Sequence, residues 1–301
     1  MYLATTTGDF SGYTDSQLDA VRWIAGSGFR FIDYNFGTDF RCMNGFFSSD
    51  RSSHAASLLR EADRLGVRFI QSHAPMGRPL EGGKYHEDFV AENIWCIESC
   101  AALGIDNVVI HSGYLMGISK EECLEKNRDF FRELLPSAEK NGVTILVENF
   151  NKMCVDGMYW IDNAPDLLQM VELVDHPLFQ AVWDAGHANM QEMPQDEALR
   201  IMGSHIRALH VQDNMGNTDA HVAPFFGTLN LDSLMHGLID IGYSGYFTFE
   251  ACNIFLPGAS RRQFDKDDRL KTVPLPLRLK GEELLYEIGK TILTAYDCFE
   301  G

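Results

Sequence analysis

The chain has 301 residues, of which 45% are hydrophobic and 23% are charged. This composition is typical of a globular protein with a large core, and it excludes disordered and fibrous classes. The formal net charge of −18 disfavours nucleic acid as a partner, because a strongly acidic surface repels a phosphate backbone. The seven cysteines include no Cys-x-x-Cys pair, which indicates reduced thiols and no zinc ribbon.

Nothing in the sequence indicates a membrane or secretory segment. No run of about 18 apolar residues is present to span a bilayer. The first residues lack the basic flank and apolar stretch of a secretory signal. We therefore expect a cytoplasmic protein with no membrane partner, and we leave a homo-oligomer open.

A repeat of helix followed by strand runs through the chain. Gly28, Gly66, Gly104 and Gly142 are spaced 38 residues apart, and each precedes an apolar run, as expected of a glycine that ends a helix and leads into a strand. Segments with a 3.6-residue apolar period predict helices at 18–25, 56–65, 94–101, 164–173, 196–202 and 231–241. The predicted strands are 2–6, 29–32, 67–70, 105–110, 143–147, 179–183, 206–211 and 246–249.

Alternation of near-continuous apolar strands with helices predicts a parallel sheet covered by helices, and eight strands predict a closed barrel. We predict an α/β fold, a single (β/α)8 TIM barrel, with one domain over residues 1–301 and its site at the carboxyl ends of the strands. A doubly wound open sheet is the alternative, but no Gly-x-Gly-x-x-Gly loop is present. A long irregular excursion at about 253–280 carries Arg261, Arg262, Lys266 and Arg269.

Six of the predicted strands end in a side chain that can bind a metal. These residues are His73, His111, Glu148, Asp184, His210 and Glu250. In an open sheet, with strands ~4.8 Å apart, the outermost of them would lie ~24 Å from each other. In a barrel the same strand ends converge on one mouth. The barrel therefore predicts one constellation of carboxylates and imidazoles, which suits Mn²⁺, Zn²⁺, Co²⁺ or Mg²⁺. We expect the remaining histidines at 54, 86, 176, 205 and 236 to be structural.

Short motifs around these positions resemble the xylose isomerase-like barrels, specifically the sugar phosphate isomerase/epimerase group. The motifs are Val147-Glu148-Asn149, Trp183-Asp184-Ala185-Gly186-His187, His210-Val211-Gln212-Asp213-Asn214, Asp219-Ala220-His221 and Phe249-Glu250. The resemblance implies that Glu148, Asp184, His210 and Glu250 hold one divalent metal and that His187 contacts the substrate. We also expect His73, His111 and His221 to bind the substrate. Ketose epimerases carry an Arg shortly after the strand-seven motif, where this chain has Asn214-Met215-Gly216-Asn217.

A related branch, the endonucleases for abasic sites in DNA, uses a three-zinc version of the same mouth. The matching residues are His73, His111, Glu148, Asp184, His187, His210, Asp219, His221 and Glu250. A second ion on His73 and His111, bridged by Glu148, therefore stays open. The net charge of −18 argues against DNA as the substrate.

The resulting expectation is a metal-dependent isomerase or epimerase that acts on a sugar or sugar phosphate. Glu148 and Glu250 would move the proton through an enediolate. A keto-inositol or keto-sugar dehydratase on the same ligands is the main alternative, and a non-catalytic sugar-binding barrel is a weaker one. The aromatic residues Phe150, Trp160, Trp183, Phe225 and Phe226 are candidates for an apolar wall against the sugar or for ordinary packing.

Overall fold

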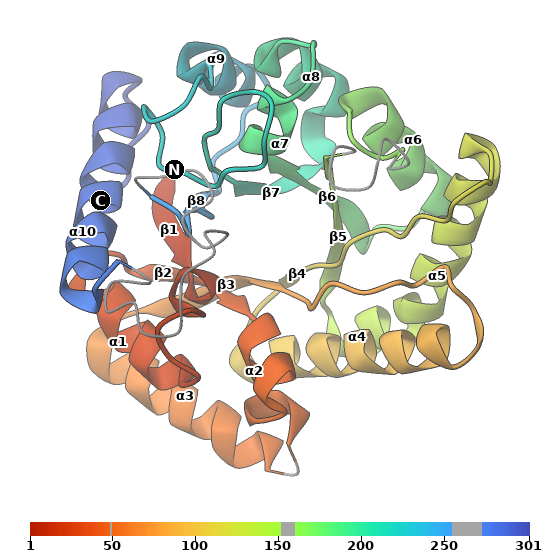
Figure 1. Cartoon of the computed structure of the whole chain (residues 1–301), viewed down its shortest axis with the longest axis horizontal. Helices are drawn as coiled ribbons and strands as arrows, with labels where there is room; N and C mark the ends of the chain where they lie inside the picture. Colours follow the sequence, from red (N-terminus) through yellow and green to blue (C-terminus); the bar gives the residue numbers. More distant parts are fainter. Residues whose placement is uncertain (49, 152–159, 255–272) are drawn as a thin grey trace, which may run out of the picture.

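The computed structural model describes residues 1–48, 50–151, 160–254 and 273–301. Eight parallel strands lie in the order β7-β6-β5-β4-β3-β2-β1-β8 around a central axis (Figure 1). Their bounds are β1 Tyr2–Thr6, β2 Phe31–Asn35, β3 Arg68–His73, β4 Asn107–Val109, β5 Thr144–Glu148, β6 Phe179–Asp184, β7 Ile206–His210 and β8 Tyr246–Phe249. A parallel bridge between Val211 and Phe249 joins the last strands, so the ring closes. The predicted (β/α)8 TIM barrel is confirmed.

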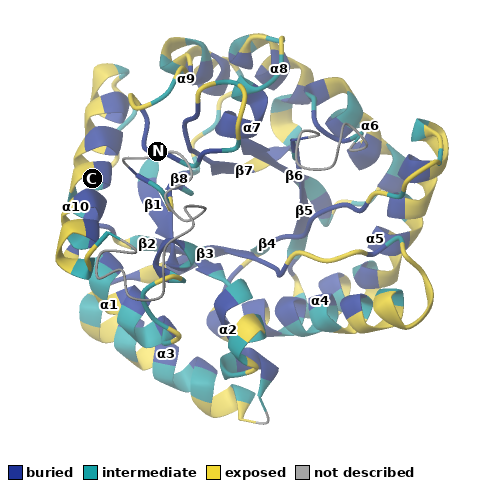
Figure 2. Ribbon diagram, viewed as in Figure 1, coloured by how far each residue is buried: buried dark blue, intermediate teal, exposed yellow. Residues whose placement is uncertain are grey.

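Helices surround the strands and cover the outer face of the barrel (Figure 1). The α-helices are α1 Gln17–Gly26, α2 Gly37–Cys42, α3 Arg51–Leu65, α4 Gly83–Leu103, α5 Lys120–Asn141, α6 Ala164–Val174, α7 Ala185–Asn189, α8 Gln195–Met202, α9 Leu231–Asp240 and α10 Leu275–Ala295. Short 3-10 turns are η1 Thr7–Phe10, η2 Gly45–Phe47 and η4 Gly203–His205. In Figure 2 the strands are mostly dark blue, and the outward helix faces are teal and yellow. None of the described helices is both long and apolar enough to cross a bilayer.

The glycine repeat has the predicted structural role. Gly66, Gly104 and Gly142 have φ angles of 67°, 70° and 66° and cap the ends of α3, α4 and α5. This left-handed conformation favours glycine, because a Cβ atom would be strained there. Gly28, with φ 109°, follows the capping residue of α1.

Two predicted strand bounds are wrong in a way that matters for the site. The second strand begins at Phe31, which is the first residue of β2 to pair with β1 and β3, and it continues to Asn35. Asp33 and Asn35 therefore belong to the strand. The fourth strand spans only Asn107–Val109, because the backbone N–H of Ile105 still donates to Cys100 in α4. The short helices α2 and α7 have no counterpart in the prediction.

Successive residues of each strand point alternately into the barrel and toward the helices. The outward residues join the main hydrophobic core, and Val109, Leu146, Val182 and Ala208 form a separate buried cluster. Each of these four residues lies two positions before a predicted site residue. The site residues are, in the same order, His111, Glu148, Asp184 and His210. The cluster therefore forms part of a layer inside the barrel, directly below the mouth. Most of the basic residues of the 253–280 excursion lie outside the described residues.

Candidate functional site

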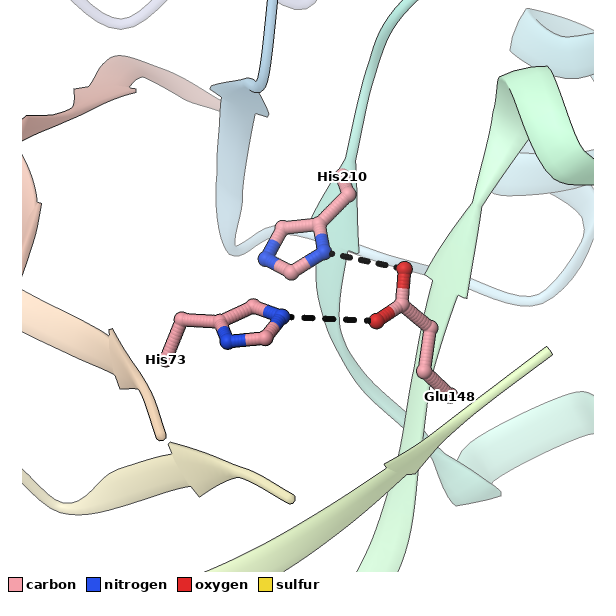
Figure 3. Close-up of side chains that lie close together, drawn as sticks. All are labelled: His73, Glu148 and His210. Carbon is pink, nitrogen blue, oxygen red and sulfur yellow. Dashed lines mark hydrogen bonds and ion pairs between the residues drawn. The ribbon is translucent and has the colours of Figure 1, made fainter. Parts of the chain in front are cut away.

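The six strand-end side chains predicted from the sequence converge at the carboxyl end of the barrel. Glu148 lies at the centre of this cluster and is only 1% exposed. Its Oε1 lies 3.2 Å from Nδ1 of His210, and its Oε2 lies 3.7 Å from Nε2 of His73, as Figure 3 shows. Oε2 also lies 3.3 Å from Nε2 of His111. Strands β3, β5 and β7, with the residue just beyond β4, thus contribute to one cluster.

In each of three groups of side chains, the ligand atoms lie within 4.8 Å of one another, and the first two groups share Glu148 and His210. The first group is the one implied by the family resemblance: Glu148, Asp184, His210 and Glu250. The second contains His73, Glu148 and His210, and the third contains His187, Asp219 and His221. The predicted ligands are therefore brought together, and the site also offers positions for further ions.

The first group meets two physical requirements of a divalent cation. Glu148 Oε2 and Asp184 Oδ2 are buried and accept no hydrogen bond among the described residues, and such groups need a compensating partner. In addition, two ligands at ~2.1 Å from one ion in a tetrahedral site lie ~3.4 Å apart. His210 Nδ1 lies 3.2 Å from Glu148 Oε1 and 3.6 Å from Glu250 Oε2. The carboxylate and imidazole donors fit a transition-metal ion or Mg²⁺.

Asp184 has a second role as the cap of α7. Its Oδ1 accepts a hydrogen bond from the backbone N–H of His187 at 2.6 Å, which starts the helix directly after β6. His187 then lies over the same cluster, with Nδ1 3.4 Å from Glu148 Oε1. Gly186 between them is required for space, because a Cβ there would lie 2.0 Å from the amide of Gln212. The Asp-Ala-Gly-His motif is thus a turn that places two polar side chains over one pocket.

Asp219 and His221 complete the side of the site near β8. His221 Nε2 lies 3.0 Å from Asp219 Oδ1, which in turn lies 3.4 Å from His187 Nε2. The Nδ1–H of His221 donates to the backbone carbonyl of Glu250 at 2.8 Å. His221 has a φ angle of 48°, a left-handed conformation that is uncommon for a residue with a side chain and is found more often near functional sites.

Two functional contacts were not found by sequence reasoning. Asn149 exchanges two hydrogen bonds with the backbone of Asp184, at 2.8 and 2.9 Å, and so aligns the ends of β5 and β6. Asp33, fully buried on β2, lies 3.5 Å from Nε2 of His210. The signal for Asp33 was a carboxylate inside an apolar run, but the strand bounds predicted from sequence ended before it.

The charged groups of the cluster shift one another's pKa values. Burial alone raises the pKa of Glu148, but its interactions with the surrounding histidines, of which that with His210 is the largest, outweigh burial and hold that pKa well below its ordinary value. Burial raises the pKa of Asp184 to about 6. Burial lowers the pKa of His111 to about 3, so its imidazole is neutral at pH 7. The pKa of His210 is raised despite its burial, because Glu250 and Glu148 attract its proton. The carboxylates therefore favour a positive charge at their centre.

A pocket of about 460 Å³ opens above the cluster. Its walls are formed by Asn35, Gly37, His73, Ala74, Pro75, Met76, His111, Glu148, Phe150, His187, Asp219, His221 and Glu250. All four histidines predicted to bind the substrate line this pocket. Of the five aromatic residues that were candidates for an apolar wall, only Phe150 lines the pocket. Its ring lies edge-on to His111 and His187, with centroids 5.0 Å from each.

Three of the other candidate aromatics, Trp183, Phe225 and Phe226, lie elsewhere. Trp183 points outward from β6 and donates a hydrogen bond to Gln195 of α8 at 2.8 Å. Phe225 and Phe226 are 63% and 45% exposed on the connection between β7 and α9. None of the histidines expected to be structural lines the pocket. His54, for example, contacts the hydroxyl of Tyr34 at 3.1 Å.

Comparison with known proteins agrees with this architecture. Residues 21–265 match the family model of the xylose isomerase-like TIM barrel. Fructoselysine 3-epimerase of Escherichia coli O157:H7 is 30% identical over 129 residues, which are 41% of this chain and 44% of that protein. The chain spans less than half of the length of this and of a D-psicose 3-epimerase that it also matches by sequence, 44% in each case.

Two solved structures share the fold over nearly the whole chain. D-psicose 3-epimerase from Clostridium cellulolyticum H10, solved with D-tagatose, has a TM-score of 0.76 and 17% identity and covers 97% of this chain and 99% of its own. The IOLI protein, solved with a binding zinc atom, also has a TM-score of 0.76, with 18% identity and coverage of 98% and 99%. The family match covers most of the barrel, including strands β2 to β8, so this chain belongs to the xylose isomerase-like TIM barrel family.

Proposed function

We propose that this chain is a metal-dependent isomerase or epimerase that acts on a sugar by proton transfer between Glu148 and Glu250. One observation carries the proposal. Two glutamates from different strands, β5 and β8, approach the same nitrogen of His210 at 3.2 and 3.6 Å at the base of a polar pocket. Carboxylates on both sides of one carbon suit the removal of a proton and its return to another face or another carbon. The activity named for the epimerase relatives supports the same reaction class.

We assign the metal to Glu148, Asp184, His210 and Glu250, the first of the three ligand groups. When bound there, a divalent cation supplies positive charge that polarises a carbonyl and stabilises negative charge on its oxygen. The buried oxygens Glu148 Oε2 and Asp184 Oδ2, which accept no hydrogen bond among the described residues, support this assignment. Zn²⁺, Mn²⁺, Co²⁺ and Mg²⁺ all suit these donors. A second ion at His73 and His111 stays open, and a metal content clearly above one per chain would support it.

In this proposal, side chains of the protein transfer the proton and bind the substrate. One glutamate accepts the proton from the carbon beside the carbonyl, and the other returns a proton. His187, with Nε2 3.4 Å from Asp219, is placed to hydrogen-bond a substrate hydroxyl, as are His73, His111 and His221 around the pocket. Phe150 supplies an apolar surface against carbon atoms of the substrate.

The charge of the pocket favours an unphosphorylated sugar. Among the described residues that line it, Glu148, Asp219 and Glu250 are carboxylates, and none is a lysine or an arginine. A phosphate dianion would be repelled by this wall. We therefore expect a free ketose to bind the metal-loaded protein at least 10-fold more tightly than its phosphate ester. Isothermal titration with matched pairs measures this difference, and tighter binding of the ester would reverse the assignment.

The same argument applies to DNA. With a net charge of −18, we expect no cleavage and no sub-micromolar binding of a duplex with an abasic site at physiological salt. A filter-binding or fluorescence assay with such a duplex checks this expectation. Tight binding would identify the chain with the DNA-repair branch of the fold.

The experiment that tests the proton transfer is turnover in D₂O. Transfer through an enediolate places deuterium on the carbon beside the carbonyl, whereas a hydride shift leaves that carbon undeuterated. Glu148→Gln and Glu250→Gln are expected to lower turnover by ~10²-fold or more, the usual scale for loss of a general acid or base. Because both residues are proposed ligands, the loss counts only in variants that retain the metal.

A matched control is Glu282→Gln, which changes a buried glutamate outside the pocket. In the parent, the hydroxyl of Thr5 donates to Oε1 of Glu282 at 2.8 Å, and the glutamine keeps an oxygen that can accept this hydrogen bond. Its turnover is expected to stay within about twofold of the parent. A product free of deuterium, or full turnover in either site variant, would reject the two-glutamate mechanism. Release of water with formation of an unsaturated or deoxy product would instead identify a dehydratase.

A further inference from the structure

A buried carboxylate lies on the far side of a predicted metal ligand. Asp33 is 0% exposed, and its Oδ2 lies 3.5 Å from Nε2 of His210. The other ring nitrogen of His210, Nδ1, faces Glu148 and Glu250 at 3.2 and 3.6 Å. The imidazole thus stands between two sets of carboxylates, one inside the barrel and one at the mouth.

Asp33 is itself held in place by neighbouring strands. The side-chain amide of Gln71 on β3 donates to Oδ2 at 2.7 Å, and the hydroxyl of Thr6 on β1 donates to Oδ1 at 3.4 Å. Gln71 in turn accepts a hydrogen bond from Thr248 of β8 at 3.3 Å. These contacts join four adjacent strands, so the position of the Asp33 carboxylate is set by the barrel and not by the chain on either side of it.

The sheet is irregular at this point. The register between β2 and β3 shifts between Ile32 and Asp33, so that Asp33 pairs with Gln71 and Ile70 is skipped. An extra residue of this kind re-aims the side chains beside it, and such bulges are frequent next to active sites. Without the shift, Asp33 would lie opposite an apolar residue and would lack the amide donor.

We propose that Asp33 is a positioning residue for His210, with a function distinct from that of the ligands. Its carboxylate holds the proton on Nε2, which leaves the lone pair of Nδ1 directed at the proposed metal position. A ligand histidine that donates its second N–H to a carboxylate has a fixed tautomer and ring orientation, and loss of such a partner typically weakens metal binding 10-fold to 100-fold. The inference rests on the metal site proposed above.

The test compares Asp33→Asn with a matched control, Asp39→Asn. Asp39 is also a buried aspartate, 1% exposed, whose Oδ2 lies 3.7 Å from a histidine Nε2, that of His54. It accepts a hydrogen bond from Tyr34 at 2.6 Å and lies outside the site. The affinity of each protein for Co²⁺ is measured by competition with a chelator, together with the visible spectrum of bound Co²⁺, which reports the geometry of the ligands.

We expect Asp33→Asn to bind Co²⁺ 10-fold to 100-fold more weakly than the parent and to change the visible spectrum. The control is expected to match the parent within about threefold. Parent-like affinity and spectrum in Asp33→Asn would overturn the inference, and so would an equal loss in the control. A parent protein that binds no divalent metal would reject the proposed metal site itself.

A second measurement needs no folded variant at position 33. In the parent protein loaded with Zn²⁺, ¹⁵N NMR of the imidazoles, with the His210 signal assigned by its loss in His210→Gln, reports which nitrogen carries the proton. We expect the proton on Nε2 and the metal on Nδ1. Metal on Nε2 would overturn the role of Asp33.

Discussion

The layer of side chains directly below the mouth has two contrasting halves. Below the site on β4 to β7 it consists of Val109, Leu146, Val182 and Ala208, a buried apolar cluster. On β8 and β1 to β3 it consists of Thr248, Thr6, Asp33 and Gln71, which are buried and hydrogen-bonded to one another. Both halves are buried inside the barrel, yet the apolar half fills space and the polar half provides hydrogen bonds that orient side chains.

The contrast shows how the barrel supports chemistry. Three of the four proposed ligands, Glu148, Asp184 and His210, stand on strands of the apolar half. The apolar layer below the site cannot orient an imidazole, because apolar side chains offer no hydrogen-bond partner. His210 therefore reaches across the barrel to Asp33 in the polar half. Changes in the two halves should accordingly have different signatures, with stability affected in one and metal affinity in the other.

The largest effect on metal binding is expected from substitution of the proposed ligands, which lie above both halves. Asp184→Ala and His210→Ala should reduce the metal content of the purified protein from about one ion per chain to almost none, because each removes a donor from a four-residue site. Elemental analysis after dialysis measures this. Metal contents equal to that of the parent in both variants would show that the ion, if present, is held elsewhere.

In the apolar half, Leu146→Ala should lower the free energy of unfolding by ~2–5 kcal/mol, since the residue is fully buried and a cavity would replace its side chain. Urea titration of the metal-free protein measures the change. Metal affinity, corrected for the unfolded fraction, should stay within about threefold of the parent. A 10-fold loss of affinity without a loss of stability would contradict the division between the halves.

In the polar half, Gln71→Met should destabilise the protein by less, ~1.5–3 kcal/mol, through loss of its hydrogen bond to the charged Asp33. Metal affinity should fall by roughly 10-fold, because the carboxylate that positions His210 loses its anchor. The two quantities are measured as for Leu146→Ala. A loss of stability together with a metal affinity equal to that of the parent would show that Thr6 alone suffices to hold Asp33.

The smallest effect is expected on the outer face of the barrel. Trp183→Phe removes the indole N–H that donates to Gln195 at 2.8 Å, and it should cost ~1–2 kcal/mol by leaving a buried acceptor unpaired. Neither metal affinity nor turnover should change beyond about twofold, although the adjacent residue is the proposed ligand Asp184. A fall in turnover would indicate that the outer packing of β6 also controls the site.

Much of the site could be predicted before the fold was known, because its residues mark the ends of strands. A polar side chain after an apolar β-branched run is visible in a single sequence, and eight such units predict that their ends converge. The candidates predicted in this way are His73, His111, Glu148, Asp184, His210 and Glu250. Asn35 and Asp33 were not, because the predicted second strand ended at residue 32.

The sequence by itself determined the order of helices and strands, the glycine caps and the identity of the ligand candidates, since these depend on local periodicity and on residue type. Only the tertiary structure decided which nitrogen of His210 faces Glu148, that Asp33 lies behind that ring, and that Trp183 points away from the pocket. These features depend on strand register and on contacts between residues far apart in the chain. A shift of one residue reverses the face on which a side chain lies, and the bulge at Asp33 is such a shift.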